Sequence, residues 1–271
     1  MKRNGSMIKR MCLVLSLLLA VRAIVFAQES ITITANGVSF QMVYIEGGTF
    51  SMGATDDQRE NAENDEYPVH QVTVSSFYLG ETEVTQQLWV AVMGKNPSYF
   101  VSKKQEASDS MKRPVEQVSW DDCQVFILEL NRLTGKQFRL PTEAEWEFAA
   151  RGGTKTRKYK YSGSNRLKTV AWCWENTGKR KSGYGTHEVK TKKPNELGLY
   201  DMSGNVWEWC QDWYGIYYGG PQVNPKGAPK GDHRIGRGGG WAGDLWDCRV
   251  SYRGISQPST RSYYIGLRLA L

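Results

Sequence analysis

The sequence predicts an irregular, loop-rich α+β fold with two or three helices and short antiparallel strands. The chain has 271 residues, of which 40% are hydrophobic and 23% charged, so it can bury the core of one large domain. Its 28 glycines and 10 tryptophans suit a fold with many loops, in which large rings fill the space between short elements. Helix signals are confined to the first part of the chain, whereas short strand-like pieces follow residue 151.

The N-terminus has the pattern of a cleavable secretion signal. Four basic residues precede an apolar run over residues 11–20, and Ala27 ends a small-residue cleavage pattern. The run is shorter than the roughly 20 residues that a spanning helix needs, although an uncleaved anchor is the alternative. Cys12 lies at the start of this run, whereas a lipid anchor needs a cysteine after it, at the cleavage site. We therefore predict a signal peptide over residues 1–27, no transmembrane helix after its removal, and a protein that is secreted or periplasmic, in the cell envelope.

The positive charge of the chain comes mostly from this segment. The formal net charge is +7, but residues 1–27 hold five basic and no acidic residues, so the rest of the chain carries about +2. Nucleic-acid binding would need a clustered cationic face. We therefore exclude nucleic acid as the expected partner.

The first elements after the signal are strands. Residues 31–34 and 38–45 are rich in apolar and β-branched side chains, and glycines at 47 and 48 indicate a turn. Residues 56–66 are acidic and aperiodic, which predicts a solvated loop before a strand-like stretch over residues 69–79.

Three segments carry helix start signals. Thr85, Ser119 and Thr142 are suitable N-cap residues. Asp122 and Glu145 follow the last two by three residues, as in a capping box. The stops are glycines: Gly94, Gly135 and Gly152. No repeat or linker divides the chain, so residues 28–271 are expected to form one domain.

Four cysteines remain after the signal, namely Cys123, Cys173, Cys210 and Cys248. Their number is even and the compartment would be oxidising, but no CxxC spacing occurs, so one disulfide is allowed and none is required. The histidines His70, His187 and His233 are scattered, which disfavours a zinc site.

Seven segments, in the same order, resemble the formylglycine-generating enzyme or sulfatase-modifying factor family. They are IEGGTFSMG at 45–53, EVT at 83–85, PVEQVSW at 114–120, RLPTEAEWE at 139–147, GLYDMSGNVWEW at 198–209, RGG at 237–239 and GLR at 266–268. The resemblance covers almost all of the mature chain and implies the C-type-lectin-like architecture. Glu143 and Glu147, on one helix face, could do acid/base work, but a structural role is the favoured interpretation.

The family's catalytic segment is incomplete here. The resemblance implies two cysteines five residues apart that hold copper(I), a soft ion that prefers thiolates. Cys248 matches the second, but Gly243 occupies the first position and Gly240 replaces a serine that assists the chemistry. Cys173 or Cys210 could approach Cys248 in the fold, which keeps a copper-dependent oxidase open as the alternative. That enzyme would convert the cysteine of a sulfatase Cys-x-Pro-x-Arg segment to formylglycine.

The resemblance also implies a calcium site, for which Asn205 and Glu208 are the matching residues. Hard oxygen ligands of this kind suit calcium, but a tight turn with an internally bonded asparagine is the alternative. A second calcium site of the family would need an acidic residue within 178–185, where none occurs, so we do not predict it.

We therefore predict an exported, non-catalytic binding or assembly domain. The partner would be a protein, a peptide or a glycan in the cell envelope or outside it. An iron-dependent sulfoxide-forming activity is disfavoured, because it would need a histidine-rich site. The aromatic and charged residues of the catalytic segment are the candidate binding residues: Trp241, Asp244, Trp246, Asp247 and Arg249.

Overall fold

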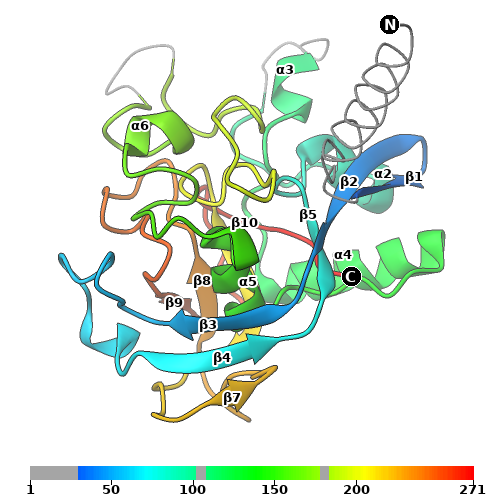
Figure 1. The fold of residues 1–271 in the computed structure, drawn as a ribbon. Helices are drawn as coiled ribbons and strands as arrows, with labels where there is room; N and C mark the ends of the chain where they lie inside the picture. Colours follow the sequence, from blue (N-terminus) through cyan, green and yellow to red (C-terminus); the bar gives the residue numbers. More distant parts are fainter. Residues whose placement is uncertain (1–29, 102–107, 178–182) are drawn as a thin grey trace, which may run out of the picture.

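The computed structural model describes residues 30–101, 108–177 and 183–271 (Figure 1). The predicted signal peptide, including Cys12, lies outside these residues. Within the described ranges, no helix is long and apolar enough to cross a membrane.

The three predicted helices are present. They are α2 (Gln86–Met93), α4 (Trp120–Thr134) and α5 (Glu143–Ala150). The hydroxyls of Thr85, Ser119 and Thr142 each accept a hydrogen bond from the backbone N–H of the third helical residue, so the predicted caps are confirmed. Gly94 and Gly135 end two of these helices in the left-handed conformation.

Within the ranges that the structure describes, four shorter helical turns were not predicted. They are α3 (Ser108–Met111), α6 (Leu167–Val170) and two 3-10 turns at Asn64–Glu66 and Gly153–Lys155. Each is only one turn long, so the sequence offers no apolar period by which to find it.

The strands of the described residues form three small sheets. The first has the order β1 (Ser30–Ala35), β2 (Val38–Ile45), β5 (Phe77–Gly80); the second has β3 (Gly48–Met52), β4 (His70–Val74), β7 (Gln222–Val223). The third has β10 (Ile265–Leu267), β6 (Trp207–Trp213), β8 (Arg234–Arg237), β9 (Gly254–Ser256).

Two strand predictions need correction. The single strand-like stretch over residues 69–79 is divided between β4 and β5, which belong to different sheets. The pairing is also not purely antiparallel, because β7 runs parallel to β4 and β10 runs parallel to β6. Both parallel pairs join segments far apart in the sequence, which local patterns cannot predict. The irregular, mixed α+β architecture itself is confirmed.

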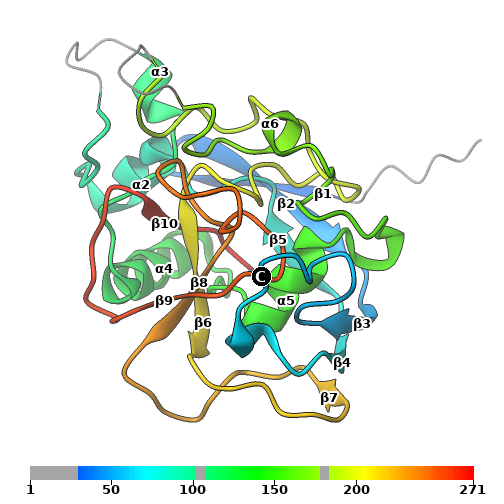
Figure 2. The same cartoon turned by 90° about the vertical axis from the view of Figure 1, so that its left-hand side faces the viewer.

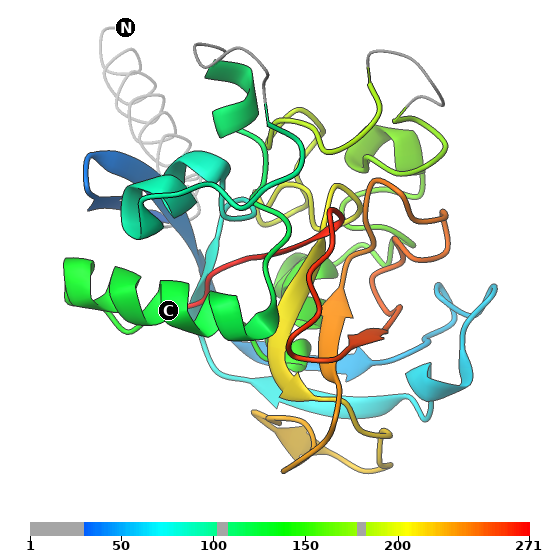
Figure 3. The same cartoon turned by 180° about the vertical axis from the view of Figure 1, so that it is seen from behind.

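Strand β6 links the two main hydrophobic clusters. Trp209 packs with α2, α4 and the first sheet, whereas Cys210 packs with α5 and the second sheet. Successive side chains of a strand point to opposite faces, so β6 contributes to both clusters at once. Trp207 has the same orientation as Trp209 and is only partly buried. Figures 2 and 3 show the orange segment between β8 and β9 passing beside α6, above this sheet.

Candidate functional site

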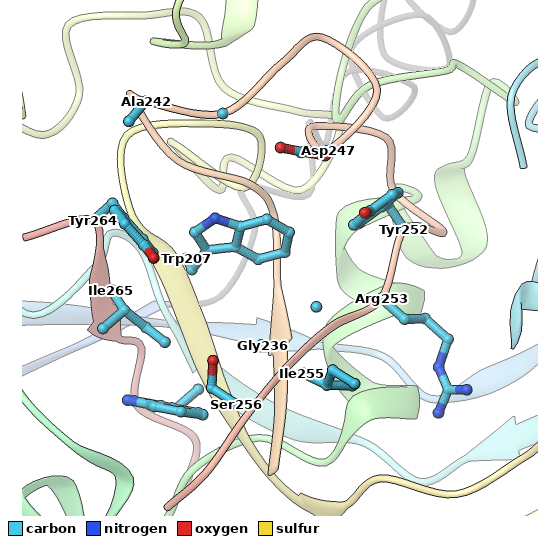
Figure 4. Close-up of a pocket in the computed structure, with 13 residues that line it drawn as sticks. Trp207, Gly236, Ala242, Asp247, Tyr252, Arg253, Ile255, Ser256, Tyr264 and Ile265 are labelled. Atoms are coloured by element: carbon cyan, nitrogen blue, oxygen red, sulfur yellow. The ribbon is translucent and has the colours of Figure 1, made fainter. Parts of the chain in front are cut away.

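A cavity of about 520 Å³ opens beside the third sheet, between β6, β9, β10 and the segment that follows β8. The indole of Trp207 lies at its centre, with Tyr264, Asp247 and Tyr252 around it (Figure 4). We call this cavity the Trp207 pocket. Its lining combines four aromatic residues, Trp207, Trp209, Tyr252 and Tyr264, with the side chains of Asp247 and Arg253. This composition is typical of a recognition site.

The position of Trp207 depends on the absence of side chains next to it. A Cβ atom at Gly254 would lie 2.6 Å from Cζ3 of Trp207, and one at Gly240 would lie 3.2 Å from Cδ1. Both glycines therefore let backbone approach the indole ring. The Tyr252 ring packs at a tilt on the same indole, with centroids 5.9 Å apart.

Asp247 supplies the carboxylate of the pocket lining, whereas Arg253, which also lines the pocket, is paired with Glu143. The Asp247 carboxylate accepts a hydrogen bond of 3.1 Å from the backbone N–H of Asp244. Burial, together with the nearby charge of Asp244, raises the pKa of Asp247 despite this bond. A Cβ atom at Gly243 would lie 2.7 Å from Oδ2 of Asp247, so any side chain at position 243 would have to displace the carboxylate.

An exposed aromatic surface adjoins the pocket. Trp241 is buried at its base and donates an indole hydrogen bond of 2.9 Å to the carbonyl of Tyr263. The rings of Phe100 and Tyr184 lie edge-on against Trp241, with centroids 5.2 and 4.7 Å away. Tyr263 packs on Tyr264, which lines the pocket, so the aromatic surface and the pocket are continuous.

The structure separates the five candidate binding residues into two groups. Asp244, Trp246 and Asp247 are exposed or partly exposed, and Asp247 lines the pocket. Trp241 and Arg249 are instead buried, at 1% and 0% exposed, so neither can contact a partner directly. Their roles are structural, because Trp241 supports the aromatic surface and Arg249 forms an internal ion pair.

Sequence reasoning missed Trp207, Tyr252 and Tyr264. Trp207 lies inside the GNVWEW motif, and its exposure could not be distinguished from that of a core tryptophan. Tyr264 directly precedes β10, which pairs with β6, whereas Tyr252 lies just before β9, which pairs with β8, and neither long-range pairing is visible in the sequence.

Cys248 is fully buried and adjoins Cys173. The two side chains belong to one small cluster with Tyr161 and Val170. The Cys173 thiol donates a hydrogen bond of 2.8 Å to the carboxylate of Glu175. Cys210 lies in a different cluster. Among the described residues, the cysteine that packs beside Cys248 is therefore Cys173. The sequence analysis had allowed either Cys173 or Cys210.

This pair does not fit a copper(I) site as it stands. Copper needs thiolates, whereas the interaction with the Cys173 side chain and burial raise the pKa of Cys248 well above its ordinary value. Both sulfur-bearing side chains are 0% exposed, and the Trp207 pocket is lined by Gly243 rather than by Cys248.

Asn205 and Glu208, the candidate calcium ligands, are already occupied by protein partners. Asn205 Oδ1 accepts from the His187 backbone N–H at 2.9 Å. Both Glu208 oxygens accept from Arg268, and Trp146 Nε1 donates to one of them at 2.6 Å. A calcium ion here would meet the Arg268 guanidinium and would have to displace these bonds, so the two residues do not form a ready cation site. The calcium site that the sequence motif implies is untested, and this arrangement leads us to expect no calcium binding at these two residues.

The two glutamates of α5 serve in ion pairs. Glu143 accepts two hydrogen bonds from Arg253, at 2.7 and 2.9 Å. Glu147 pairs with both Arg151 and Arg237. The favoured structural interpretation of these carboxylates agrees with this arrangement, since each charge is neutralised in the interior.

Comparisons with known proteins match the chain over nearly its whole described length. Residues 30–271 match the family model described as the sulfatase-modifying factor enzyme 1-like domain. The chain is 34% identical to the chaperone protein LppX of Paenibacillus barcinonensis, over 80% of this chain and 84% of that protein. It is 30% identical to the formylglycine-generating enzyme of Streptomyces coelicolor, over 84% and 88% of the two chains.

A solved structure is similar as well. The variable protein 1 of Treponema denticola superposes with a TM-score of 0.76 at 36% identity, over 89% of this chain and 98% of that one. This match confirms the C-type-lectin-like fold class that the sequence motifs imply.

Proposed function

The chain belongs to the sulfatase-modifying factor enzyme 1-like family, and from this premise we propose that it is an exported, non-catalytic domain that binds a partner through the Trp207 pocket. The observation that carries the proposal is the residue at position 243, which is a glycine and not a metal-binding cysteine. Where a copper-binding cysteine is expected, Gly243 admits the carboxylate of Asp247 to the pocket wall. The pocket has thereby gained a recognition group in place of a redox ligand.

The chemistry of the pocket favours a polypeptide or glycan partner in the cell envelope. Aromatic rings contribute large contact areas with little loss of conformational entropy. The carboxylate of Asp247 adds a hydrogen-bond acceptor beside them. The exposed Tyr99, Tyr184 and Tyr263 extend the contact surface beyond the cavity. A relative named as a chaperone protein supports a protein partner.

Export is part of the proposal and is supported by the basic and apolar pattern of residues 1–27. It is tested by sequencing the N-terminus of the protein recovered from the envelope of its native cells. A mature N-terminus at residue 28 is the expected result, and an intact N-terminus in the cytosol would contradict export.

Partner binding is tested by cross-linked capture in the native envelope. The wild type is compared with Tyr264→Ala, which alters the pocket, and with Leu128→Ala, which alters an exposed site on α4. We expect the same partner with the wild type and with Leu128→Ala, and at least a tenfold loss with Tyr264→Ala. Equal capture by all three proteins would contradict the pocket as the binding site.

The copper-dependent oxidase is the second candidate, and the contact between Cys173 and Cys248 is the observation in its favour. Both thiols would have to be deprotonated to hold copper(I), which would supply the oxygen-activating chemistry, and the raised pKa of Cys248 opposes this. Tight equimolar copper(I) binding that disappears in both Cys173→Ala and Cys248→Ala would establish this candidate and overturn the non-catalytic proposal.

A further inference from the structure

Cys173 and Cys248 are brought together from distant parts of the chain. Cys173 follows α6, and Cys248 lies in the segment between β8 and β9. Both side chains are 0% exposed, and they pack in one small cluster with Tyr161 and Val170. The backbone also joins the two segments, because the N–H of Trp174 donates to the carbonyl of Gly243 at 3.1 Å. The contact is therefore part of a fixed packing arrangement.

The remaining described cysteines lie elsewhere. Cys123 is on α4, in the cluster with Trp209, and Cys210 is on β6, in the cluster with α5. Both are fully buried. Among the described cysteines, Cys173 and Cys248 are therefore the pair that the fold brings together. Cys123 and Cys210 can serve as internal controls.

We propose that Cys173 and Cys248 form a disulfide bond in the exported protein. Two adjacent thiols become one disulfide with loss of two hydrogens, which a disulfide-containing oxidant accepts as it is reduced to two thiols. One protein thiolate first attacks the oxidant and forms a mixed disulfide. The second protein thiolate then attacks the protein sulfur of that bond and releases the reduced oxidant.

The disulfide would hold the wall of the Trp207 pocket. Cys248 directly follows Asp247, and the loop that contains Trp174 is hydrogen-bonded to Gly243, another residue of the wall. A covalent link at Cys248 would therefore restrict the movement of the segment that carries the proposed recognition groups. Formation of this disulfide in the cell rests on the proposed export of the protein, whereas its formation in a defined redox buffer does not.

The test is differential alkylation of the purified full chain, equilibrated with oxidised and reduced glutathione. Free thiols are labelled first under denaturing conditions, and thiols released by reduction receive a second label before peptide mapping. We expect the second label on Cys173 and Cys248 and the first label on Cys123 and Cys210. Persistence of both Cys173 and Cys248 as free thiols in excess oxidised glutathione, after refolding in that buffer, would overturn the proposal.

The thermal midpoint gives a second, independent measurement. A disulfide that closes a loop of roughly 75 residues should raise the midpoint by about 5 to 10 °C relative to the reduced protein. This dependence on reductant should be absent from Cys173→Ala and from Cys248→Ala, and present in the control Cys123→Ala. An equal response to reductant in all folded variants would contradict the pairing. Even if the disulfide does not form, loss of partner capture in Tyr264→Ala alone would support the Trp207 pocket as the binding site. The disulfide proposal and the binding proposal can therefore fail separately.

Discussion

Arg249 and Glu66 form a doubly hydrogen-bonded ion pair in the interior, although 183 positions separate them. The two guanidinium nitrogens of Arg249 donate to the two oxygens of Glu66 at 2.8 and 2.5 Å, and neither side chain is exposed. Ser251 adds a hydrogen bond to Glu66. The pair anchors the acidic loop to the segment between β8 and β9 that forms part of the pocket wall, so the predicted solvation of this loop is wrong for Glu66.

Removal of the charge of Glu66 should therefore destabilise the protein. Glu66→Gln leaves Arg249 buried without a counter-charge, and we expect a loss of about 3 to 5 kcal/mol in the free energy of unfolding. Asp56→Asn, in the same loop, breaks an exposed ion pair with Arg59 and should cost less than about 1 kcal/mol. Urea denaturation measures both variants. Equal, small losses would mean that the buried pair contributes no more than the exposed one.

A glycine substitution should move Trp207 and thereby alter the pocket. Gly254→Ala places a Cβ atom 2.6 Å from the indole, so the ring or β9 must shift, at a cost of about 1 to 3 kcal/mol. The matched control is Gly219→Ala, where nothing lies within 4 Å of the added Cβ. Stability and partner capture should both fall in Gly254→Ala and remain close to wild type in the control. Normal capture by Gly254→Ala would show that recognition does not depend on the position of Trp207.

Asp212 should give the protein a measurable pH dependence. Burial and the charge of Glu143 raise the pKa of Asp212 to about 8, although the backbone N–H of Glu143 donates a hydrogen bond to it. The native state therefore holds a proton that the unfolded state releases near pH 4, and this group's contribution to stability falls as pH rises from about 4 to about 8.

Asp212→Asn removes this titration while it keeps an acceptor oxygen for Glu143. The stability of the variant relative to wild type should rise by about 1.4 kcal/mol per pH unit across the middle of that interval. Urea denaturation at pH 5, 6 and 7 gives the slope. Parallel stability curves for the two proteins would contradict a raised pKa at Asp212.

The sequence could predict elements whose signals are local. The N-caps at Thr85, Ser119 and Thr142 act within one turn, and all three helices begin where the caps indicate. The candidate site was predicted only in part, because exposure depends on contacts between distant segments. Arg249 and Asp247 are two residues apart, yet one is internal and the other lines the pocket, since only Arg249 meets the buried Glu66. The partner of Cys248 likewise became evident only in the fold.

Calcium should leave the thermal midpoint unchanged if the hydrogen bonds of Asn205 and Glu208 persist. A ligand that binds only the native state raises stability by RT ln(1 + [L]/Kd), about 2.7 kcal/mol at a hundredfold excess over Kd. Because Arg268 occupies both oxygens of Glu208 with a positive charge, we expect no such rise with added calcium. Asn205→Ala should be destabilised through its lost bonds to His187 and Glu83, equally with and without calcium. A calcium-dependent rise in the wild type that Asn205→Ala lacks would instead establish the calcium site that the sequence motif implies.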